Sequence, residues 1–391
     1  MLEHLYPSLE HYVRQYEARR DCAGLPPHRR MLERLFAPYN DPRNGGEFLA
    51  ALEEKLSAEE AAVWCAYPEY TIDAAAKTPA QIRADLPADL QGRAEALSAA
   101  LAEKGFLYPT PTKTGENGYL CTYLLDVIVY WTSHPDGSKL ADAVAHYWED
   151  LMQGDSARLR RPYTEHRVIP HEGALTGETR HGRIPMDLAI PDGREVLDMD
   201  RLTAMLRRCR RFAVMPCICR TIEENKHARR CDFPIEDVCV TFDQAAEAVI
   251  SSGAGREVTM EELLEIVRRC RDMGLVQVIS NAEHPLALCN CCSCCCLCLR
   301  TLQRYEDVVC GPARFEADPV RREKCVACGK CETLCPMGAV YFEHGAVQVR
   351  GGQCVGCGVC VSQCPGGVLR LVKKPGAETE MPVDTMDRVY I

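Results

Sequence analysis

The sequence lacks the features that mark several classes of protein. Its first residues, MLEHLYPSLEHY, show no basic start followed by an apolar run, so we expect no secretory signal peptide. The longest apolar stretch, at 119–131, is too short to span a bilayer and contains Asp126. The segment SSGAGRE at 251–257 lacks the G-x-G-x-x-G spacing of a dinucleotide-binding loop. These absences favour a cytoplasmic protein that has no membrane insertion and no nicotinamide or flavin fingerprint.

An excess of positive charge is also missing. The chain carries a formal net charge of −10, and residues 1–150 contain 14 basic against 23 acidic side chains. Affinity for nucleic acid comes largely from lysines and arginines that neutralise phosphates. We therefore do not expect nucleic acid as a partner.

Cysteine, in contrast, is abundant. The 391-residue chain has 25 cysteines, and the stretch CNCCSCCCLC at 289–298 places seven of them in ten positions. Disulfide frameworks are typical of small secreted chains, whereas dense cysteine in a large cytosolic chain indicates metal binding or redox chemistry. The cysteines are therefore candidates for metal ligands first.

The cysteines divide the sequence into regions. Three lie in the first 150 residues, 14 lie in 201–310 and eight lie in 318–372. The pattern predicts an α+β multidomain protein with a winged-helix-like helical N-terminal domain, a Cys-rich α/β middle domain and a C-terminal ferredoxin-like dicluster domain. The expected bounds are 1–152 for the helical domain, 153–200 for a connector, 201–312 for the Cys-rich domain, 313–373 for the dicluster domain and 374–391 for a tail.

The N-terminal region predicts two helices followed by a hairpin. TPAQIRADL at 78–86 begins with Thr78 as an N-cap, and a stronger helix at 90–108 ends at Gly105. Two apolar runs then flank the turn-rich PTKTGENG. This order resembles a winged helix-turn-helix module. Acidic residues accompany Arg93 and Lys104 on its second helix, so we interpret it as a docking or dimerisation surface.

Two copies of one motif carry the clearest chemical signal. CVACGKCETLCP has the spacing C-x2-C-x2-C-x3-C-P, and CVGCGVCVSQCP repeats it 29 residues later. Zinc knuckles also use C-x2-C, but they need two such pairs separated by a longer loop. The duplication resembles the bacterial two-cluster ferredoxin family.

That resemblance implies two [4Fe–4S] clusters and one-electron transfer at low potential. Three cysteines of each motif wrap one cluster, and the last cysteine crosses to the other. The first cluster is then held by Cys325, Cys328, Cys331 and Cys364, and the second by Cys354, Cys357, Cys360 and Cys335.

The middle region has a second pattern, P-C-x-C-R followed by single cysteines and C-N-C-C. It resembles a poorly characterised family of iron–sulfur proteins from anaerobes that join a winged-helix-like N-terminus to a dicluster ferredoxin. Thiols two positions apart on an extended segment face the same side, so they can share a metal centre. The candidate ligands are Cys217, Cys219, Cys231, Cys239, Cys289, Cys291 and Cys292.

Several centres fit these thiols. We expect a further iron–sulfur cluster, with a zinc site formed by Cys217, Cys219, Cys231 and Cys239 as the alternative and a redox-sensing switch as another. Positive charge near the thiolates could come from Arg220, Lys226, Arg229 and Arg230.

Some cysteines of the region have other interpretations. Cys209 and Cys270 lie on helical patterns and are expected in the core. If the chain turns helical after Asn290, Cys291, Cys294, Cys295 and Cys298 share one stripe, and Cys292 and Cys296 face elsewhere. Cys294, Cys295, Cys296 and Cys298 are then supporting or core thiols, or ligands of a further cluster.

Together these patterns predict an iron–sulfur electron-transfer protein that works with a redox partner protein. A redox-responsive winged-helix regulator remains an alternative, as does a reductase or activase acting on a small substrate or on a partner's cofactor. Whether the chain is itself an enzyme, and whether it forms a homo-oligomer, stays open.

Overall fold

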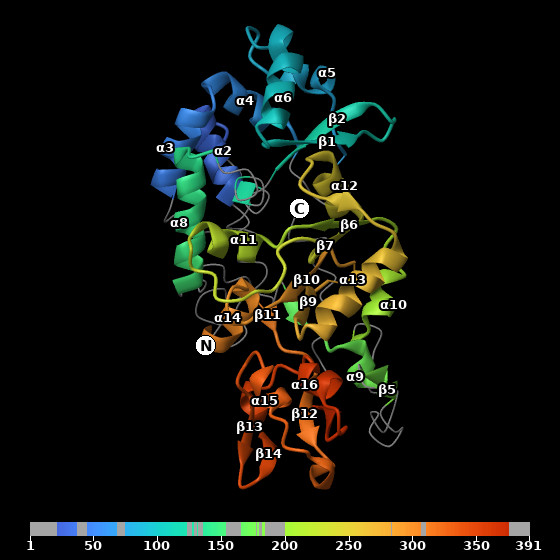
Figure 1. The fold of residues 1–391 in the computed structure, drawn as a ribbon. Helices are drawn as coiled ribbons and strands as arrows, with labels where there is room; N and C mark the ends of the chain where they lie inside the picture. Colours follow the sequence, from blue (N-terminus) through green and yellow to red (C-terminus); the bar gives the residue numbers. More distant parts are fainter. Residues whose placement is uncertain are drawn as a thin grey trace. The chain divides into compact units, whose positions relative to one another are not determined.

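The chain is a mixed α/β protein organised as two compact units (Figure 1). The first unit comprises Met1–Tyr163, Gln244–Arg256 and Asp384–Ile391, and the second comprises Thr164–Asp243 and Glu257–Val383. The computed structural model describes residues 22–36, 45–68, 75–122, 127–128, 131, 136–153, 166–176, 178–179, 182–183, 200–282, 284–305 and 310–374. Most of the expected connector at 153–200 and of the tail at 374–391 lies outside them. Within these ranges, no helix combines the length and the apolar character needed to cross a membrane.

Helices dominate the first unit. They are α2 (Pro27–Phe36), α3 (Gly45–Lys55), α4 (Ala58–Ala66), α5 (Pro79–Ile82), α6 (Ala94–Glu103) and α8 (Lys139–Gln153), with most of α12 (Asp243–Ser251). Phe36, Phe48 and Tyr147 pack edge to face at the junction of α2, α3 and α8, with ring centroids 5.1 to 5.9 Å apart.

The expected order of helix, helix and hairpin is present at 78–122. Thr78 caps α5 and forms a reciprocal capping box with Gln81, which confirms the predicted N-cap. Gly105 follows α6 with φ of 76°, and β1 (Leu107–Pro111) pairs antiparallel with β2 (Asn117–Cys121). The assignment of this segment as a winged helix stays a prediction.

The second unit is built on a seven-stranded sheet. In spatial order its strands are β11 (Cys310–Gly311), β3 (His166–Val168), β9 (Val276–Ser280), β10 (Ala287–Cys291), β7 (Cys239–Phe242), β6 (Phe212–Met215) and β8 (Arg256–Glu257). β11 and β3 are parallel, whereas the successive pairings of β3 with β9, β9 with β10, β10 with β7 and β7 with β6 are antiparallel.

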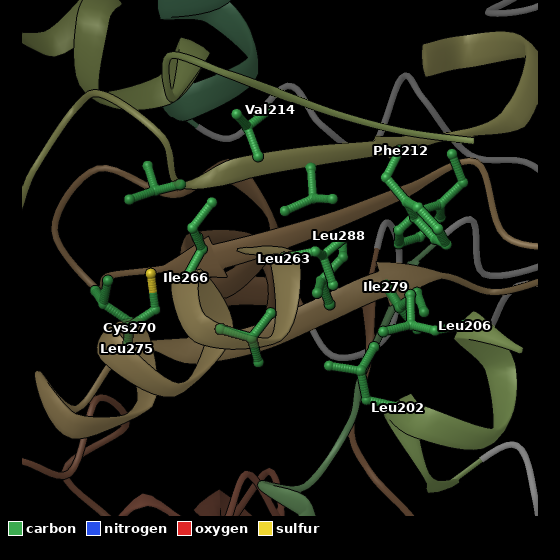
Figure 2. Close-up of a cluster of buried hydrophobic side chains, with 14 of the residues drawn as sticks. Leu202, Leu206, Phe212, Val214, Leu263, Ile266, Cys270, Leu275, Ile279 and Leu288 are labelled. Atoms are coloured by element: carbon green, nitrogen blue, oxygen red, sulfur yellow. The ribbon is translucent and has the colours of Figure 1, made fainter. Parts of the chain in front are cut away.

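One helix supplies much of the core beneath this sheet. α13 (Met260–Asp272) begins at the predicted capping box of Thr259 and Glu262, which is confirmed. Figure 2 shows its Leu263, Ile266 and Cys270 within the same apolar cluster as sheet residues. Cys270 is fully buried there, as expected for a core thiol, and Cys209 packs against the same cluster.

The remaining helices of this unit are shorter. They are α9 (Glu172–Thr176), α10 (Leu202–Leu206), α11 (Ile218–Asn225) and α14 (Leu297–Tyr305). A two-stranded pair, β4 (Glu178–Thr179) and β5 (Gly182–Arg183), follows α9.

The C-terminal module of the second unit repeats a small pattern. β12 (Phe315–Pro319) pairs antiparallel with β15 (Leu369–Lys373), so the ends of the module are joined. Between them lie α15 (Lys330–Thr333), the hairpin of β13 (Val340–Glu343) and β14 (Ala346–Val349), and α16 (Val359–Gln363). Figure 1 shows these orange-to-red elements gathered in one group.

Candidate metal centres

The sequence duplication at the C-terminus is also a duplication of backbone conformation. Gly329 and Gly358 precede α15 and α16 with φ of 68° and 75°. Two residues earlier, Ala327 and Gly356 also have positive φ, at 51° and 71°. Positive φ at alternate residues folds each C-x2-C-x2-C segment into a tight loop whose three thiols converge.

The loop of the first copy opens onto a cavity with about 350 Å³ of empty space, part of it open to solvent. Its apolar walls include Val326, Phe342 and Leu369. Four thiols line it, and these are Cys325, Cys328, Cys331 and Cys364. The structure thus brings together the four cysteines that the sequence resemblance assigned to the first cluster.

The loop of the second copy opens onto a cavity with about 320 Å³ of empty space, part of it open to solvent. Val340, Val355 and Met337 contribute apolar walls. The thiols that line it are Cys335, Cys354, Cys357 and Cys360, so the last cysteine of the first motif lies with the second loop.

Each cavity fits a [4Fe–4S] cluster by its donor set. A cubane requires four thiolates, and each cavity is lined by four thiols and otherwise mainly by apolar side chains. Backbone amides add donors to the sulfurs, since Ala339 N–H donates to Cys335 Sγ at 3.2 Å and Val368 N–H donates to Cys364 Sγ at 3.4 Å. Such amides stabilise the negative charge of a bound cluster.

Burial changes the protonation of a thiol in each cavity. It raises the pKa of Cys357 to about 12 and that of Cys331 to about 11. Thiols with such pKa values stay protonated at neutral pH unless a metal displaces the proton. Each cavity is therefore a candidate site for a metal centre.

The two cavities differ in exposure. Cys328 is exposed and the neighbouring Val326 is 68% exposed, whereas Cys357 and Cys360 are only 8% and 7% exposed. We call the first cavity the outer cavity and the second the inner cavity.

Cysteines of the Cys-rich region gather at one edge of the sheet. The antiparallel register places Cys239, at the start of β7, opposite both Met215 of β6 and Cys289 of β10. The end of β6, the start of β7 and the end of β10 therefore meet there. All 25 cysteines of the chain are free of disulfides.

Four of these thiols form a compact group, here called the four-thiol group. The Sγ atoms of Cys231, Cys292, Cys294 and Cys295 lie within 4.8 Å of one another. Cys231 Sγ is 3.8 Å from both Cys292 Sγ and Cys295 Sγ, and Cys294 Sγ is 3.6 Å from the same two atoms.

Eight further thiols form a connected network beside it, here called the thiol network. Cys296 is its centre, since it contacts Cys219, Cys298 and, with an Sγ–Sγ distance of 2.9 Å, Cys291. Hydrogen bonding to Cys219, together with burial, raises the pKa of Cys217. Its members are Cys217, Cys219, Cys239, Cys289, Cys291, Cys296, Cys298 and Cys310.

The seven ligands expected from the middle region thus fall into two places. Cys231 and Cys292 belong to the four-thiol group, and the other five belong to the thiol network. Cys289 and Cys291 share the extended strand β10, as the alternation requires. Cys217 and Cys219 do not share an extended strand. Pro216 follows the end of β6, and α11 begins at Ile218 with Cys217 as its N-cap.

The stretch 289–298 is not helical after Asn290. β10 continues to Cys291, a turn follows with Cys296 N–H donating to Cys292 O at 3.2 Å, and α14 begins only at Leu297. This turn brings Cys294 and Cys295 to Cys292, and it returns Cys296 to Cys291, while Cys298 contacts Cys296. The helical stripe considered from the sequence is therefore wrong.

Positive charge reaches both sets of thiols. The guanidinium of Arg220 is fully buried and donates to the carbonyls of Pro234 and Asn290 at 2.8 Å. It also contacts the Cys292 thiol, and Arg229 contacts the Cys231 thiol. Hydrogen bonds from Cys294 and Cys295, together with Arg220, hold the pKa of Cys292 far below its usual value.

Cys310 was not singled out from the sequence. It stands alone in VVCGPAR, but β11 places it against Cys298 of α14. Only the tertiary pairing of β11 with β3 could have identified it.

Comparison with known proteins supports the C-terminal assignment. Residues 319–365 match a family model described as a 4Fe-4S dicluster domain. The chain therefore carries a ferredoxin-like iron–sulfur domain at its C-terminus. Neither the curated proteins nor the solved structures contain a match to the chain.

Proposed function

We propose that this protein carries single electrons between a partner protein and a centre in its Cys-rich region, through two [4Fe–4S] clusters. The outer cluster is held by Cys325, Cys328, Cys331 and Cys364, and the inner by Cys335, Cys354, Cys357 and Cys360. The match to a 4Fe-4S dicluster domain and the two four-thiol cavities support this assignment. A cytoplasmic location is part of the proposal.

The observation that carries the proposal is the difference between the two cavities. The outer one has an exposed ligand, Cys328, and an exposed apolar neighbour, Val326. The exposed side chains around it include Arg322, Lys324 and Lys330. A cluster that reacts with a partner protein needs such access. Glu323 and Glu332 are exposed beside these basic side chains, so the surface offers both signs of charge to a partner.

The inner cavity faces the Cys-rich part of the same unit. His171 N–H donates to Cys357 O at 2.9 Å, and Gln363 Nε2 donates to Arg271 O at 3.1 Å. Ala313, three residues after the network thiol Cys310, donates its N–H to Val355 O at 2.8 Å. The inner cluster would therefore stand between the outer cluster and the thiol network.

The third centre would be an iron–sulfur cluster held by the thiol network. Five of its eight thiols are ligands expected from the sequence, namely Cys217, Cys219, Cys239, Cys289 and Cys291. The buried Arg220 faces Cys217 and Cys291 and could offset the charge of a bound cluster.

Anaerobic iron and sulfide analysis with EPR tests this arrangement. Three clusters predict about twelve irons per chain, and each should accept one electron. Cys328→Ser, Cys357→Ser and Cys219→Ser should each remove or alter one different cluster, while the control Cys209→Ser should alter none. If Cys219→Ser changes neither the iron content nor any EPR signal, the third cluster is excluded. If Cys328→Ser and Cys357→Ser change nothing, the electron-transfer proposal itself fails.

No observation favours the regulator alternative. Arg93 lies 2.7 Å from Glu59, and Lys104 Nζ lies 2.6 Å from the buried Glu60. These two cations of the winged-helix-like segment therefore serve ion pairs within their own unit. A reductase or activase role likewise has no specific observation in its favour.

A further inference from the structure

The four-thiol group has a geometry that differs from that of a cluster site. In a cubane each cysteine binds a different iron, so the four sulfurs surround the whole cluster. In a mononuclear site all four bind one ion and must lie closer together. The sulfurs of the group are mutually within 4.8 Å, with neighbouring pairs at 3.6 and 3.8 Å.

These distances can be compared with those of one metal ion. A zinc–thiolate bond is about 2.3 Å long, so the edge of a regular ZnS4 tetrahedron is about 3.8 Å. Four Sγ–Sγ edges of the group, two of 3.8 Å and two of 3.6 Å, agree with that value. The space between the sulfurs is thus that of a single ion.

The charges around the group agree with a tetrathiolate. Four thiolates and one divalent ion carry a net charge of about −2. Arg220 is fully buried and contacts Cys292, and Arg229 contacts Cys231. The other hydrogen bonds of the Arg220 guanidinium go to neutral carbonyls, those of Pro234 and Asn290. Because a buried cation is costly without a negative partner, thiolate sulfur is the expected counter-charge.

We propose that Cys231, Cys292, Cys294 and Cys295 bind one zinc ion in a closed tetrahedral site, separate from the iron–sulfur clusters. Its role is structural. The segment 226–238, which carries Cys231, contains neither helix nor strand and has positive φ at His227 and Asp237. The ion would fasten this segment to the turn between β10 and α14.

All four ligands are thiolates and no position is left open, which is the pattern of structural rather than catalytic zinc. The proposal goes beyond electron transfer, and it uses none of the thiols assigned to the clusters. It revises the zinc alternative from the sequence, because Cys217, Cys219 and Cys239 lie in the thiol network and only Cys231 is shared.

Metal analysis of the anaerobically purified full chain tests the proposal. We expect one zinc per chain in addition to the cluster irons, and zinc-edge X-ray absorption should show four sulfur neighbours at about 2.3 Å. Cys294→Ser should lower zinc content at least tenfold under dialysis against a chelator while the iron and sulfide contents remain unchanged. Cys209→Ser, which changes a partly buried thiol outside the group, should keep its zinc.

The absorption measurement uses the unaltered protein, so it holds even where a variant fails to fold. The proposal would be overturned if the protein contained no zinc, or if iron occupied the site. It would also be overturned if the zinc had nitrogen or oxygen neighbours, or if Cys294→Ser lost iron and sulfide. An absence of zinc with intact EPR signals would leave the electron-transfer proposal standing, so the two failures are distinguishable.

Discussion

His171 Nδ1 lies 3.2 Å from Ser362 Oγ, and this pair joins the residue before α9 to the ferredoxin-like module. The other ring nitrogen, Nε2, lies 2.9 Å from Leu275 O. A carbonyl can only accept, so Nε2 carries the proton and Nδ1 accepts from the serine. The fully buried ring therefore fixes α16, which follows the inner-cavity loop, against Leu275, the residue directly before β9.

This contact predicts a dependence of stability on pH. Burial lowers the pKa of His171 from 6.5 to about 4. Above pH 6.5 the ring is neutral in both folded and unfolded chains, so it contributes its full stability. As the pH falls from 6.5 towards 4, only the unfolded chain takes up the proton, and the loss approaches about 3 kcal/mol.

Denaturation midpoints measured anaerobically between pH 7.5 and 5.5 would reveal the effect. His171→Gln, whose side chain does not titrate, should show a flatter pH dependence than the unaltered chain. His146→Gln is the control for the loss of a histidine, because His146 is 67% exposed and belongs to the other unit. Equal slopes in the chain with and without His171 would refute the assignment.

A second prediction concerns two glycines with similar backbone angles. A Cβ at Gly356 would lie 2.0 Å from Phe315 O, whereas a Cβ at Gly329 would meet nothing within 4 Å. Ala327 adopts positive φ at the position equivalent to Gly356, so the backbone angle alone does not require glycine there.

We therefore expect Gly329→Ala to cost about 1–2 kcal/mol, the strain of a left-handed alanine. Gly356→Ala should cost at least about 3 kcal/mol because the carbonyl of Phe315 must also move. Thermal unfolding followed by cluster absorbance would compare the two. Similar losses in both variants would contradict the role of the Phe315 contact.

How far the sequence predicted this structure depends on the range of the contacts. The two C-x2-C-x2-C-x3-C-P motifs predicted the grouping of eight thiols, because three ligands of each set lie within one loop and the duplication itself supplies the fourth. The caps at Thr78 and Thr259 were equally local and are confirmed. Such features are encoded by neighbours in sequence.

The sorting of the middle cysteines was not predictable in this way. Cys231 and Cys292 are 61 positions apart, and Cys219 and Cys296 meet only because the end of β6, the start of β7 and the end of β10 lie together. Within 289–298, one turn decides which thiol joins which set, and that turn depends on where β10 stops. An argument from helical periodicity could not locate this turn.

Arg220 provides a third prediction. Replacing it with glutamine removes the buried charge that faces Cys217 and Cys292, and breaking a buried pair on one side costs about 3–5 kcal/mol. Arg220→Lys should recover part of the loss, since it keeps the charge but cannot reach both Pro234 O and Asn290 O. Chemical denaturation, together with metal content, measures both effects.

Arg268→Gln, on the exposed side of α13, should match the unaltered chain, and an equally mild effect of Arg220→Gln would exclude the charge-compensation role.

The last prediction concerns the order in which the clusters react with solutes. Cys328 is exposed and Val326 is 68% exposed at the outer cavity, but Cys357 and Cys360 at the inner cavity are 8% and 7% exposed. A polar oxidant such as ferricyanide should therefore oxidise and release iron from the outer cluster first, in a fast phase of about four irons. Mössbauer spectra of iron-57-labelled protein would count the irons in each phase. The fast phase should vanish in Cys328→Ser and persist in Cys357→Ser, because only the first variant alters the exposed cavity. A fast phase that persists in Cys328→Ser would place the accessible cluster elsewhere.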